Sequence, residues 1–338
     1  MLSMKILIIR FSSLGDIVLV SPVTRALAEW FPDAETSVAV KLMYEPIARL
    51  LPGVDTIIPF RSDQGFAAYI KTIRQREFDL VIDLHANPRS RMLSKFSGAG
   101  RVIRYRKRHL ARMGMVYRTG SSIATRHTVD LYLDTLKSLD IEGRDRLPSL
   151  TVHPEAHATI SERLRADGIP IGQPILGIAP GASSAVKRWP AEYFADLADR
   201  CRREYTTAIL LIGSRNDQLT AATIATAMDA PPLDWTGTID LSLLPAVFSH
   251  CHTVISNDSG PMHVASAAGT PVTGLFGPTH PKLGFSPTGS DDSALTLNLG
   301  CSPCSMHGNK ACWKKTNACL NDLSVDYVFQ EVSRHFAS

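Results

Sequence analysis

The chain has 338 residues, of which 44% are hydrophobic and 20% are charged. This length favours two domains of roughly 100–200 residues each, and the composition excludes a disordered or a membrane-spanning protein. No apolar run approaches the roughly 20 residues of a membrane helix. Met1–Lys5 leads straight into an apolar strand without the pattern of a secretory signal, so we expect a cytoplasmic protein.

The formal net charge of +4 is unevenly distributed. Residues 84–129 contain eleven Lys and Arg and no Asp or Glu, which leaves the rest of the chain at −7. A basic segment of this kind attracts polyanions such as nucleic acid, an anionic membrane surface or a phosphorylated substrate. The simpler alternative is a solvated surface with a charge bias.

Apolar runs alternate with helical periodicity along the first half of the chain. Strands are expected at 4–10, 36–40, 56–60 and 79–83, and helices at 17–30, 44–51, 66–76 and 130–139. This alternation predicts an α/β domain with a parallel sheet wrapped by helices on both faces.

A polar, proline-bearing stretch at 144–154 and a Pro/Gly cluster at 168–174 separate two predicted domains, 1–160 and 170–338. Beyond them, strands are expected at 175–179, 207–212, 253–256 and 272–276, and helices at 190–205, 216–228, 241–249 and 262–268. Two doubly wound domains with a cleft between them are therefore predicted, each binding its ligand at the carboxyl ends of its strands.

Asp16 closes a Ser-Ser-Leu-Gly-Asp turn between the first strand and the first helix. Its spacing alone favours a helix-capping role, worth about 1 kcal/mol. A carboxylate at this end of a sheet is also placed to act on a ligand.

Two turns of the second half suit phosphate. Ala179–Pro190 (APGASSAVKRWP) combines a small-residue loop with two cations, although it lacks the spacing of a P-loop. Ser256–His263 (SNDSGPMH) offers backbone N–H groups at the start of a helix. With the turn at Phe276–Thr279, they predict a ligand that carries a diphosphate.

Together these segments resemble glycosyltransferase family 9, the ADP-heptose:lipopolysaccharide heptosyltransferases. The resemblance covers nearly the whole chain and rests on MKILIIRFSSLGDIVLVSPV, VIDLHANPRS, IAPGASSAVKRWPAEYFADLA and SNDSGPMHVASAAGTPVTGLFGPT. It implies the GT-B fold, two facing Rossmann-like domains, with the acceptor bound mainly by the first and the nucleotide sugar mainly by the second.

The resemblance implies a role for individual residues. Asp16 matches the general base of an inverting transfer, and Lys187 matches the lysine that contacts the diphosphate. The implied donor-binding residues are Gly181, Ala182, Asp234, Thr236, Asp258, Ser259, Gly260, His263 and Gly277. The implied acceptor-binding residues are Ser12, Ser13, Asn87, Arg89 and Arg104. His263 could equally be a packed helix residue.

The resemblance also implies the partners of the reaction. The donor would be ADP-heptose, and the acceptor an anionic inner-core lipopolysaccharide whose carboxylates and phosphates suit Arg and Lys. No catalytic metal is expected. The Arg101–Arg118 stretch would contact the acceptor, or anionic lipid at the cytoplasmic face of the inner membrane as a peripheral protein.

Four of the six cysteines, Cys301, Cys304, Cys312 and Cys319, lie within nineteen residues at 301–319. In a reducing compartment such a set more often holds a metal than disulfides, and four thiolates suit structural zinc or iron. Four unligated thiols are the alternative. Some proteins similar to this family, which place heptose on autotransporter proteins, have an iron-bound cysteine finger.

Other functions stay open at this point. A protein O-heptosyltransferase would use the same chemistry on a serine, and another family 9 transferase would use another nucleotide sugar. A nucleic-acid-binding module is disfavoured, because the basic segment has only three interleaved aromatic residues. A NAD-dependent dehydrogenase is disfavoured because the first turn lacks the glycine fingerprint.

Overall fold

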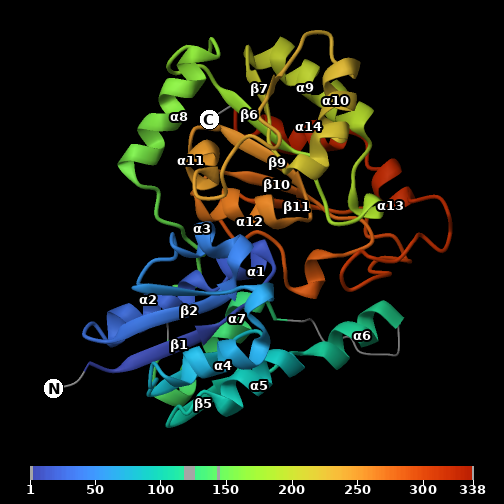
Figure 1. Cartoon of the computed structure of the whole chain (residues 1–338). Helices are drawn as coiled ribbons and strands as arrows, with labels where there is room; N and C mark the ends of the chain where they lie inside the picture. Colours follow the sequence, from blue (N-terminus) through green and yellow to red (C-terminus); the bar gives the residue numbers. More distant parts are fainter. Residues whose placement is uncertain (1–2, 118–125, 143–144, 337–338) are drawn as a thin grey trace. The chain divides into compact units, whose positions relative to one another are not determined.

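The structure is a computed structural model that describes residues 3–117, 126–142 and 145–336. The chain divides into two compact units. The first unit comprises Met1–Arg108 and Arg126–Thr151, and the second comprises His109–Thr125 and Val152–Ser338. Each unit has its own parallel sheet, in agreement with the predicted pair of Rossmann-like domains (Figure 1).

The first unit has a five-stranded sheet in the order β3-β2-β1-β4-β5. Its strands are β1 (Lys5–Ile9), β2 (Glu35–Lys41), β3 (Thr56–Phe60), β4 (Leu80–Asp83) and β5 (Arg101–Arg104), all parallel to their neighbours. The central strands β1 and β4 are almost entirely buried. Burial on both faces explains why they read as uninterrupted apolar runs and not as alternating ones.

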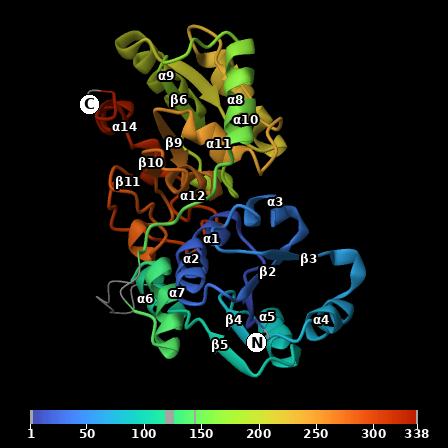
Figure 2. The same ribbon diagram turned by 90° about the vertical axis from the view of Figure 1, so that its left-hand side faces the viewer.

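Helices cover both faces of this sheet. They are α1 (Leu14–Val18), α2 (Ser21–Trp30), α3 (Glu45–Ala48), α4 (Phe66–Arg74), α5 (Pro88–Phe96) and α7 (Thr128–Leu133), with short 3₁₀ turns at Leu42–Tyr44, Ser62–Gln64 and Asp134–Leu139. In Figure 2, α2 and α7 lie on one side of the strands and α4 and α5 on the other. An aromatic core that includes Phe11, Phe60 and Tyr69 fills the second side.

The single helix expected at 17–30 is two helices, α1 and α2. Pro22 lies in the first turn of α2 and has no N–H to donate to Val18, so a continuous helix would lose that hydrogen bond. The Ser21 hydroxyl donates to the Val18 carbonyl instead, at 2.7 Å. The break leaves α1 as a short element that carries Asp16.

The basic segment contains structure that the sequence pattern did not predict. Helix α5 begins where Asn87 accepts a hydrogen bond from the Ser90 N–H at 2.8 Å, with Pro88 at the first helical position. The next strand, β5, is the edge of the sheet and is largely exposed, so it lacks the apolar run of a central strand.

The second unit has a six-stranded parallel sheet in the order β11-β10-β9-β6-β7-β8. Its strands are β6 (Ile175–Ala179), β7 (Ala208–Leu211), β8 (Leu233–Asp234), β9 (Thr253–Asn257), β10 (Val272–Leu275) and β11 (Ser293–Leu295). In order of occurrence this is 3-2-1-4-5-6, the strand order of a dinucleotide-binding Rossmann fold. The order reverses between β6 and β9, which places the expected ligand site where these two strands end.

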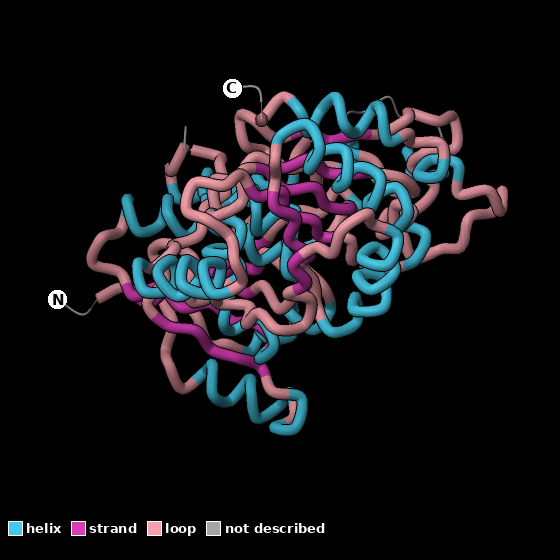
Figure 3. Tube along the Cα trace, turned by 90° about the horizontal axis from the view of Figure 1, so that it is seen from above, coloured by secondary structure: helices cyan, strands magenta, loops and turns pink. Residues whose placement is uncertain are grey.

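Helices enclose the second sheet as well (Figures 1 and 3). They are α8 (Pro154–Ala166), α9 (Ala191–Tyr205), α10 (Gln218–Ala227), α11 (Leu244–Ser249), α12 (Gly260–Ala267), α13 (Ala318–Asn321) and α14 (Val325–Ser333), with 3₁₀ turns at Ala185–Lys187, Arg215–Asp217 and Pro281–Leu283. A further helix, α6 (His109–Tyr117), also belongs to the second unit. Helices α9, α10 and α14 pack together on one face, and α8, α11 and α12 on the other. No helix within the described residues has both the length and the apolar character needed to span a bilayer.

Among the described residues of the second unit, four helices lie where no helix was predicted: α6, α8, α13 and α14. Helix α8 begins with Pro154 in its first turn and lies between the polar stretch at 144–154 and the Pro/Gly cluster at 168–174. The basic segment contributes α6, although residues up to Arg108 and again from Arg126 belong to the first unit.

Candidate functional site

In the first unit, the carboxyl end of β1 carries an ion pair between a buried arginine and a partly buried aspartate. Arg10 follows β1 directly and is 7% exposed, and one guanidinium nitrogen lies 2.5 Å from the Asp16 carboxylate on α1. Another guanidinium nitrogen donates to the Leu84 carbonyl just beyond β4, at 2.8 Å. Arg10 therefore links the ends of β1 and β4, the two strands at which the order of this sheet reverses.

Asp16 is held in its ionised form. Burial by itself raises the pKa of this carboxyl, but the Arg10 charge and hydrogen bonds from Ser13 outweigh burial and leave the pKa below its usual value. The Ser13 hydroxyl donates to Asp16 Oδ2 at 2.9 Å and the Ser13 N–H donates at 3.2 Å. The predicted capping contact is thus present, and the carboxylate also has a cation beside it.

His85 lies close to this ion pair and was not predicted as a site residue. Burial, followed by the charges of Arg10 and Lys107, lowers its pKa to about 3, so its imidazole is neutral at physiological pH. The ring meets Phe11 edge-on at 5.6 Å between centroids. Its Nδ1 is buried without a hydrogen-bond partner in the described part of the chain.

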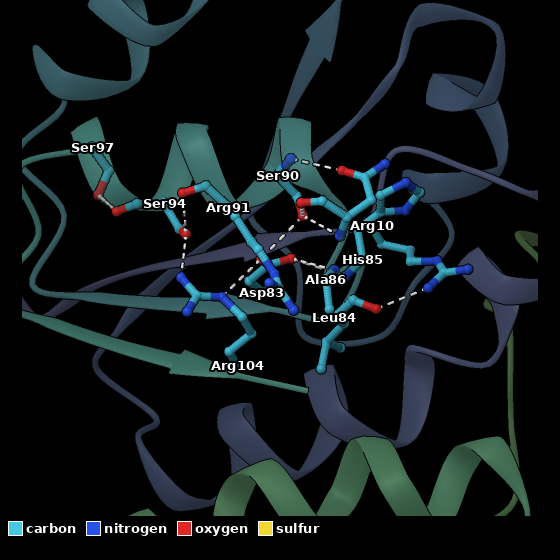
Figure 4. Close-up of polar contacts among 11 residues, drawn as sticks. Arg10, Asp83, Leu84, His85, Ala86, Ser90, Arg91, Ser94, Ser97 and Arg104 are labelled. Carbon is cyan, nitrogen blue, oxygen red and sulfur yellow. Dashed lines mark hydrogen bonds and ion pairs between the residues drawn. The ribbon is translucent and has the colours of Figure 1, made fainter. Parts of the chain in front are cut away.

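A second buried carboxylate, Asp83, organises the end of β4 (Figure 4). It is fully buried, and its two oxygens accept from the backbone N–H groups of His85 and Ala86, from the Ser90 hydroxyl at 3.0 Å and from Arg104 Nε at 3.3 Å. Arg104 also donates to the Ser94 hydroxyl at 2.9 Å. Arg104, a predicted acceptor residue, therefore helps to hold the loop that follows β4.

The other predicted acceptor residues lie at the same edge of the first sheet. Ser12 and Ser13 form the turn before α1, and Asn87 caps α5. Arg89, in the first turn of α5, is exposed and holds its guanidinium over the rings of Phe60 and Phe66, at 5.9 and 5.5 Å from their centroids. Among the described residues, Arg89 makes no ion pair with a carboxylate.

In the second unit, a buried cation lies at the carboxyl ends of β6 and β9. Lys187 Nζ is 2.8 Å from Asp258 Oδ2, and the two residues are 8% and 9% exposed. The Thr279 hydroxyl donates to the same carboxylate oxygen at 2.6 Å. Three loops that are distant in sequence thus meet at one carboxylate.

Buried polar contacts fix these loops in place. The fully buried Asn257 donates to the Pro180 carbonyl at 2.8 Å and accepts from the Trp189 N–H at 3.0 Å. Gly181 leaves no room for a side chain, since a Cβ there would lie 2.6 Å from either carboxylate oxygen of Asp217. Arg188 donates to the Ala182 carbonyl at 3.1 Å. Gly181 and Ala182 therefore form a rigid turn beside Lys187.

Four further predicted donor residues lie at α12 and after β10. Ser259 caps α12, and Gly260 begins it, so their N–H groups stand at a helix N-terminus, as predicted from the sequence. His263 is a buried residue of the same helix. Gly277 follows β10, and a Cβ on it would overlap Leu320.

Asp234 and Thr236 lie at the end of β8. The Asp234 carboxylate accepts the Thr236 N–H at 2.8 Å, and Asp234 itself is exposed. Thr236 is 3% exposed, and its hydroxyl is buried without a hydrogen-bond partner in the described residues. Asp234 is therefore accessible to a ligand, and within the described residues no hydrogen bond or ion pair links Asp234 or Thr236 to Lys187 or Asp258.

The four cysteines of the 301–319 segment are free thiols, as are Cys201 and Cys251. Burial and the other three thiols raise the pKa of Cys319 to about 11, so the four groups influence one another. Within the described ranges, however, no three His, Cys, Asp or Glu side chains are grouped so that they could hold a metal ion. The four thiols therefore lie near one another but are not arranged as metal ligands.

The basic segment is not one uniform surface. Arg101 bonds the Ser138 carbonyl, Arg126 pairs with Asp134, and the Arg112 guanidinium lies 4.5 Å from the centre of the Phe285 ring. Arg118, the end of the stretch expected to face acceptor or lipid, lies outside the described residues.

Comparison with known proteins decides the family. The sequence pattern described as glycosyltransferase family 9 (heptosyltransferase) matches residues 66–314, well over half of the chain. The protein belongs to glycosyltransferase family 9. It is therefore a glycosyltransferase, and the predicted family is confirmed.

Individual relatives agree with this assignment. Lipopolysaccharide heptosyltransferase 2 of Escherichia coli K12 is 25% identical over 298 residues, covering 83% of this chain and 84% of the relative. The solved structure of the E. coli ADP-heptose lipopolysaccharide heptosyltransferase II has a TM-score of 0.79 at 23% identity, covering 99% of both chains. The iron-containing dodecameric glycosyltransferase TibC of E. coli has a TM-score of 0.61 at 11% identity, covering 99% of this chain and 78% of TibC. The predicted GT-B fold is confirmed.

Reasoning from sequence missed several members of these sites. Arg10 and Thr279 stand inside motifs that the sequence analysis quoted, but their roles depend on which carboxylate each one meets. These contacts join residues from different turns, and the periodicity of apolar residues does not predict them. Asn257 precedes Asp258 directly and was likewise overlooked.

Proposed function

We propose that the protein transfers a heptose from ADP-heptose to an inner-core lipopolysaccharide acceptor, with inversion at the anomeric carbon. The observation that carries the proposal is the buried Lys187–Asp258–Thr279 cluster at the switch point of a Rossmann sheet, in a chain whose relatives are lipopolysaccharide heptosyltransferases. The cluster supplies a cation where a nucleoside diphosphate is expected to bind.

In this proposal the second unit binds the donor. Lys187 contacts the diphosphate, and the N–H groups of Ser259 and Gly260 donate to phosphate oxygens from the start of α12. Negative charge grows on the β-phosphate as the glycosidic bond breaks, and these groups stabilise it. The chemistry then requires no catalytic metal. Asp258 binds hydroxyls of the sugar, while Asp234 and Thr236 contact the nucleoside.

The first unit activates the acceptor. Asp16 takes the proton from an acceptor hydroxyl as that oxygen attacks the anomeric carbon from the face opposite to ADP. One C–O bond forms, the bond to the β-phosphate oxygen breaks, and ADP leaves with the electron pair. Arg10 keeps Asp16 ionised and therefore ready to accept the proton.

Exposed cations of the first unit would bind the anionic acceptor. Arg89 is the foremost of them, because two aromatic rings hold its guanidinium while its carboxylate-binding edge is left unused among the described residues. A serine of a surface protein is the alternative acceptor. The cluster of four cysteines at 301–319 favours that alternative.

Titration calorimetry with ADP, UDP, GDP and NAD tests the nature of the donor. The proposal predicts that ADP binds at least tenfold more tightly than the other three. A preference for UDP or GDP would indicate a different sugar nucleotide. Binding of none would leave the second unit without its proposed ligand.

We also propose a cytoplasmic location with peripheral contact at the inner membrane. Helix α5 exposes Met92 and Phe96 to solvent, by 43% and 49%, beside the exposed Arg91 and Lys95. Exposed apolar groups among cations suit an anionic lipid surface, where each basic residue contributes about 1 kcal/mol.

Replacing both Arg91 and Lys95 by Glu is therefore expected to weaken binding to vesicles of phosphatidylcholine and phosphatidylglycerol more than tenfold. Co-sedimentation at low and high salt measures the effect, and wild-type binding should fall as salt rises. Arg203→Glu, on the exposed end of α9, should bind like the wild type. Equal binding of the wild type to vesicles without phosphatidylglycerol would contradict the proposal.

We propose, finally, that Cys301, Cys304, Cys312 and Cys319 hold a structural zinc or iron. Support comes from the sequence, which places four cysteines within nineteen residues, since four thiolates bind either metal. The described side chains are not grouped as ligands, so binding would have to draw the four thiols together. The metal would crosslink the 301–319 segment and take no part in transfer.

Metal analysis of the purified protein is expected to find about one zinc or iron per chain. Cys304→Ser should remove most of that metal, because it takes away one of four ligands. Cys201→Ala, at a buried thiol in the core of the second unit, should retain it. A wild-type chain purified anaerobically without metal would show that the thiols are unligated.

A further inference from the structure

Gly308, in the cysteine segment, lies directly against Lys187. A Cβ on residue 308 would overlap the Cγ and Cδ atoms of Lys187 and lie 3.3 Å from its Cε. Gly308 is buried, and its φ of 66° is in the left-handed region that favours glycine. The side chain of Lys187 can therefore extend toward Asp258 only if residue 308 has no side chain.

The same segment holds the loop that carries Thr279. The backbone N–H groups of Cys304 and Ser305 donate to the Pro278 carbonyl at 2.9 and 3.1 Å. The Ser302 hydroxyl donates to the carbonyls of Gly277 and Thr279, at 2.8 and 3.3 Å. Hydrogen bonds from three residues of this segment thus hold residues 277–279 in place.

Ser305 joins these two sets of contacts. It is 2% exposed, and its hydroxyl oxygen accepts the Gly308 N–H at 2.9 Å. Its own N–H is bonded to Pro278. The position of Gly308 against Lys187 is therefore tied to the position of the Thr279 loop, and both Lys187 and Thr279 meet at Asp258.

We propose that residues 302–308 position Lys187 and Thr279 for binding the donor diphosphate, with Gly308 as the residue that determines where the lysine lies. The proposal rests on the proposed function in one respect, namely that Lys187 contacts the diphosphate. It assigns the cysteine segment a role in donor affinity, although none of its residues has to touch the donor. Gly308 and Ser305 are positioning residues and not catalytic ones.

Gly308→Ala tests the proposal, with Gly172→Ala as its matched control. Gly172 also has a positive φ, of 84°, but a Cβ there would meet no atom within 4 Å. Both variants carry the backbone cost of alanine in the left-handed region, and only the first displaces Lys187. Ser305→Ala removes the anchor of Gly308 without adding bulk, and covers the case in which Gly308→Ala fails to fold.

Two readouts are needed. Calorimetry with ADP is expected to show binding about tenfold or more weaker in Gly308→Ala, since a charge-assisted contact is misplaced, and less than twofold weaker in Gly172→Ala. Reductive methylation followed by peptide mass spectrometry reports the access of reagent to Lys187 without any donor. The buried lysine should react slowly in the wild type and several-fold faster in Gly308→Ala and in Ser305→Ala.

The outcomes separate this proposal from the function on which it rests. If Lys187 reacts at the wild-type rate in both Gly308→Ala and Ser305→Ala, or if ADP affinity is unchanged in both while Lys187→Ala loses it, the positioning role is wrong. If the wild type does not bind ADP although its variants expose Lys187 as expected, positioning is upheld and the proposed donor fails.

Discussion

Replacing Asp16 by Asn is expected to lower the rate of transfer by about 10²–10⁴-fold, the usual contribution of a general base. The amide keeps the size of the side chain and an oxygen that can accept from Ser13, but it cannot take the acceptor proton. Donor binding should stay within about twofold of the wild type, since the base acts on the acceptor. Single-turnover kinetics and ADP calorimetry on the same preparation measure both quantities.

Stability needs its own control in this experiment. Loss of the carboxylate leaves the guanidinium of Arg10 buried without its partner, which is destabilising. Asp16→Asn should therefore be compared with Arg10→Met/Asp16→Asn, which removes both charges, by thermal unfolding. Turnover within tenfold of the wild type in a folded Asp16→Asn protein would mean that another group is the base.

The second large effect is expected at Lys187. Lys187→Ala should weaken ADP binding by about 10–100-fold, the size expected for losing a charge-assisted contact, and should slow transfer as well. The slower rate follows because the same cation stabilises the charge that develops on the departing β-phosphate. Calorimetry with ADP and initial rates at saturating donor measure the two effects separately.

Arg203→Ala provides the matched control for this variant. It removes one positive charge from an exposed ion pair at the end of α9 and leaves the Lys187–Asp258–Thr279 cluster intact, so ADP affinity should not change. A Lys187→Ala protein that binds ADP and transfers sugar like the wild type would place the diphosphate elsewhere in the molecule.

Much of the fold could be predicted because its central strands are buried on both faces. β1, β4, β6 and β9 are short apolar runs followed by a turn and a helix, and this local pattern needs no tertiary information. The edge strands β5, β8 and β11 were missed, whereas β3, at the other edge of the first sheet, was predicted. β5 has an arginine at each end and is largely exposed, so its place beside β4 is set by pairing and not by an apolar pattern.

Helices were missed for different reasons. α5 carries three cations within nine residues, and its charge suggested a polyanion-binding surface, although Asn87 and Pro88 provide a helix start signal. α8 begins with proline inside a stretch that was interpreted as a linker. In both cases the helix-initiating residues were visible, and composition was given more weight than capping.

The turns that form the candidate sites were predicted, but the contacts between side chains within them were not. The sequence placed Asp16, Lys187 and Asp258 at the ends of strands, and the structure pairs Asp16 with Arg10 and Lys187 with Asp258. Arg104 shows which contacts cannot be predicted from the sequence. Its contact with the acceptor stays a prediction, but its bond to the buried Asp83 could not be predicted, because only the folded chain brings these two residues together.

The central claim is heptosyl transfer from ADP-heptose to a lipopolysaccharide core. The most direct measurement incubates the purified protein with ADP-heptose and lipopolysaccharide from a heptose-deficient strain, and follows ADP release together with the mass of the acceptor. We expect ADP release that depends on the acceptor, with the acceptor gaining one heptose. If ADP-heptose stays intact with every lipopolysaccharide acceptor, including those that already carry one heptose, the claim is contradicted.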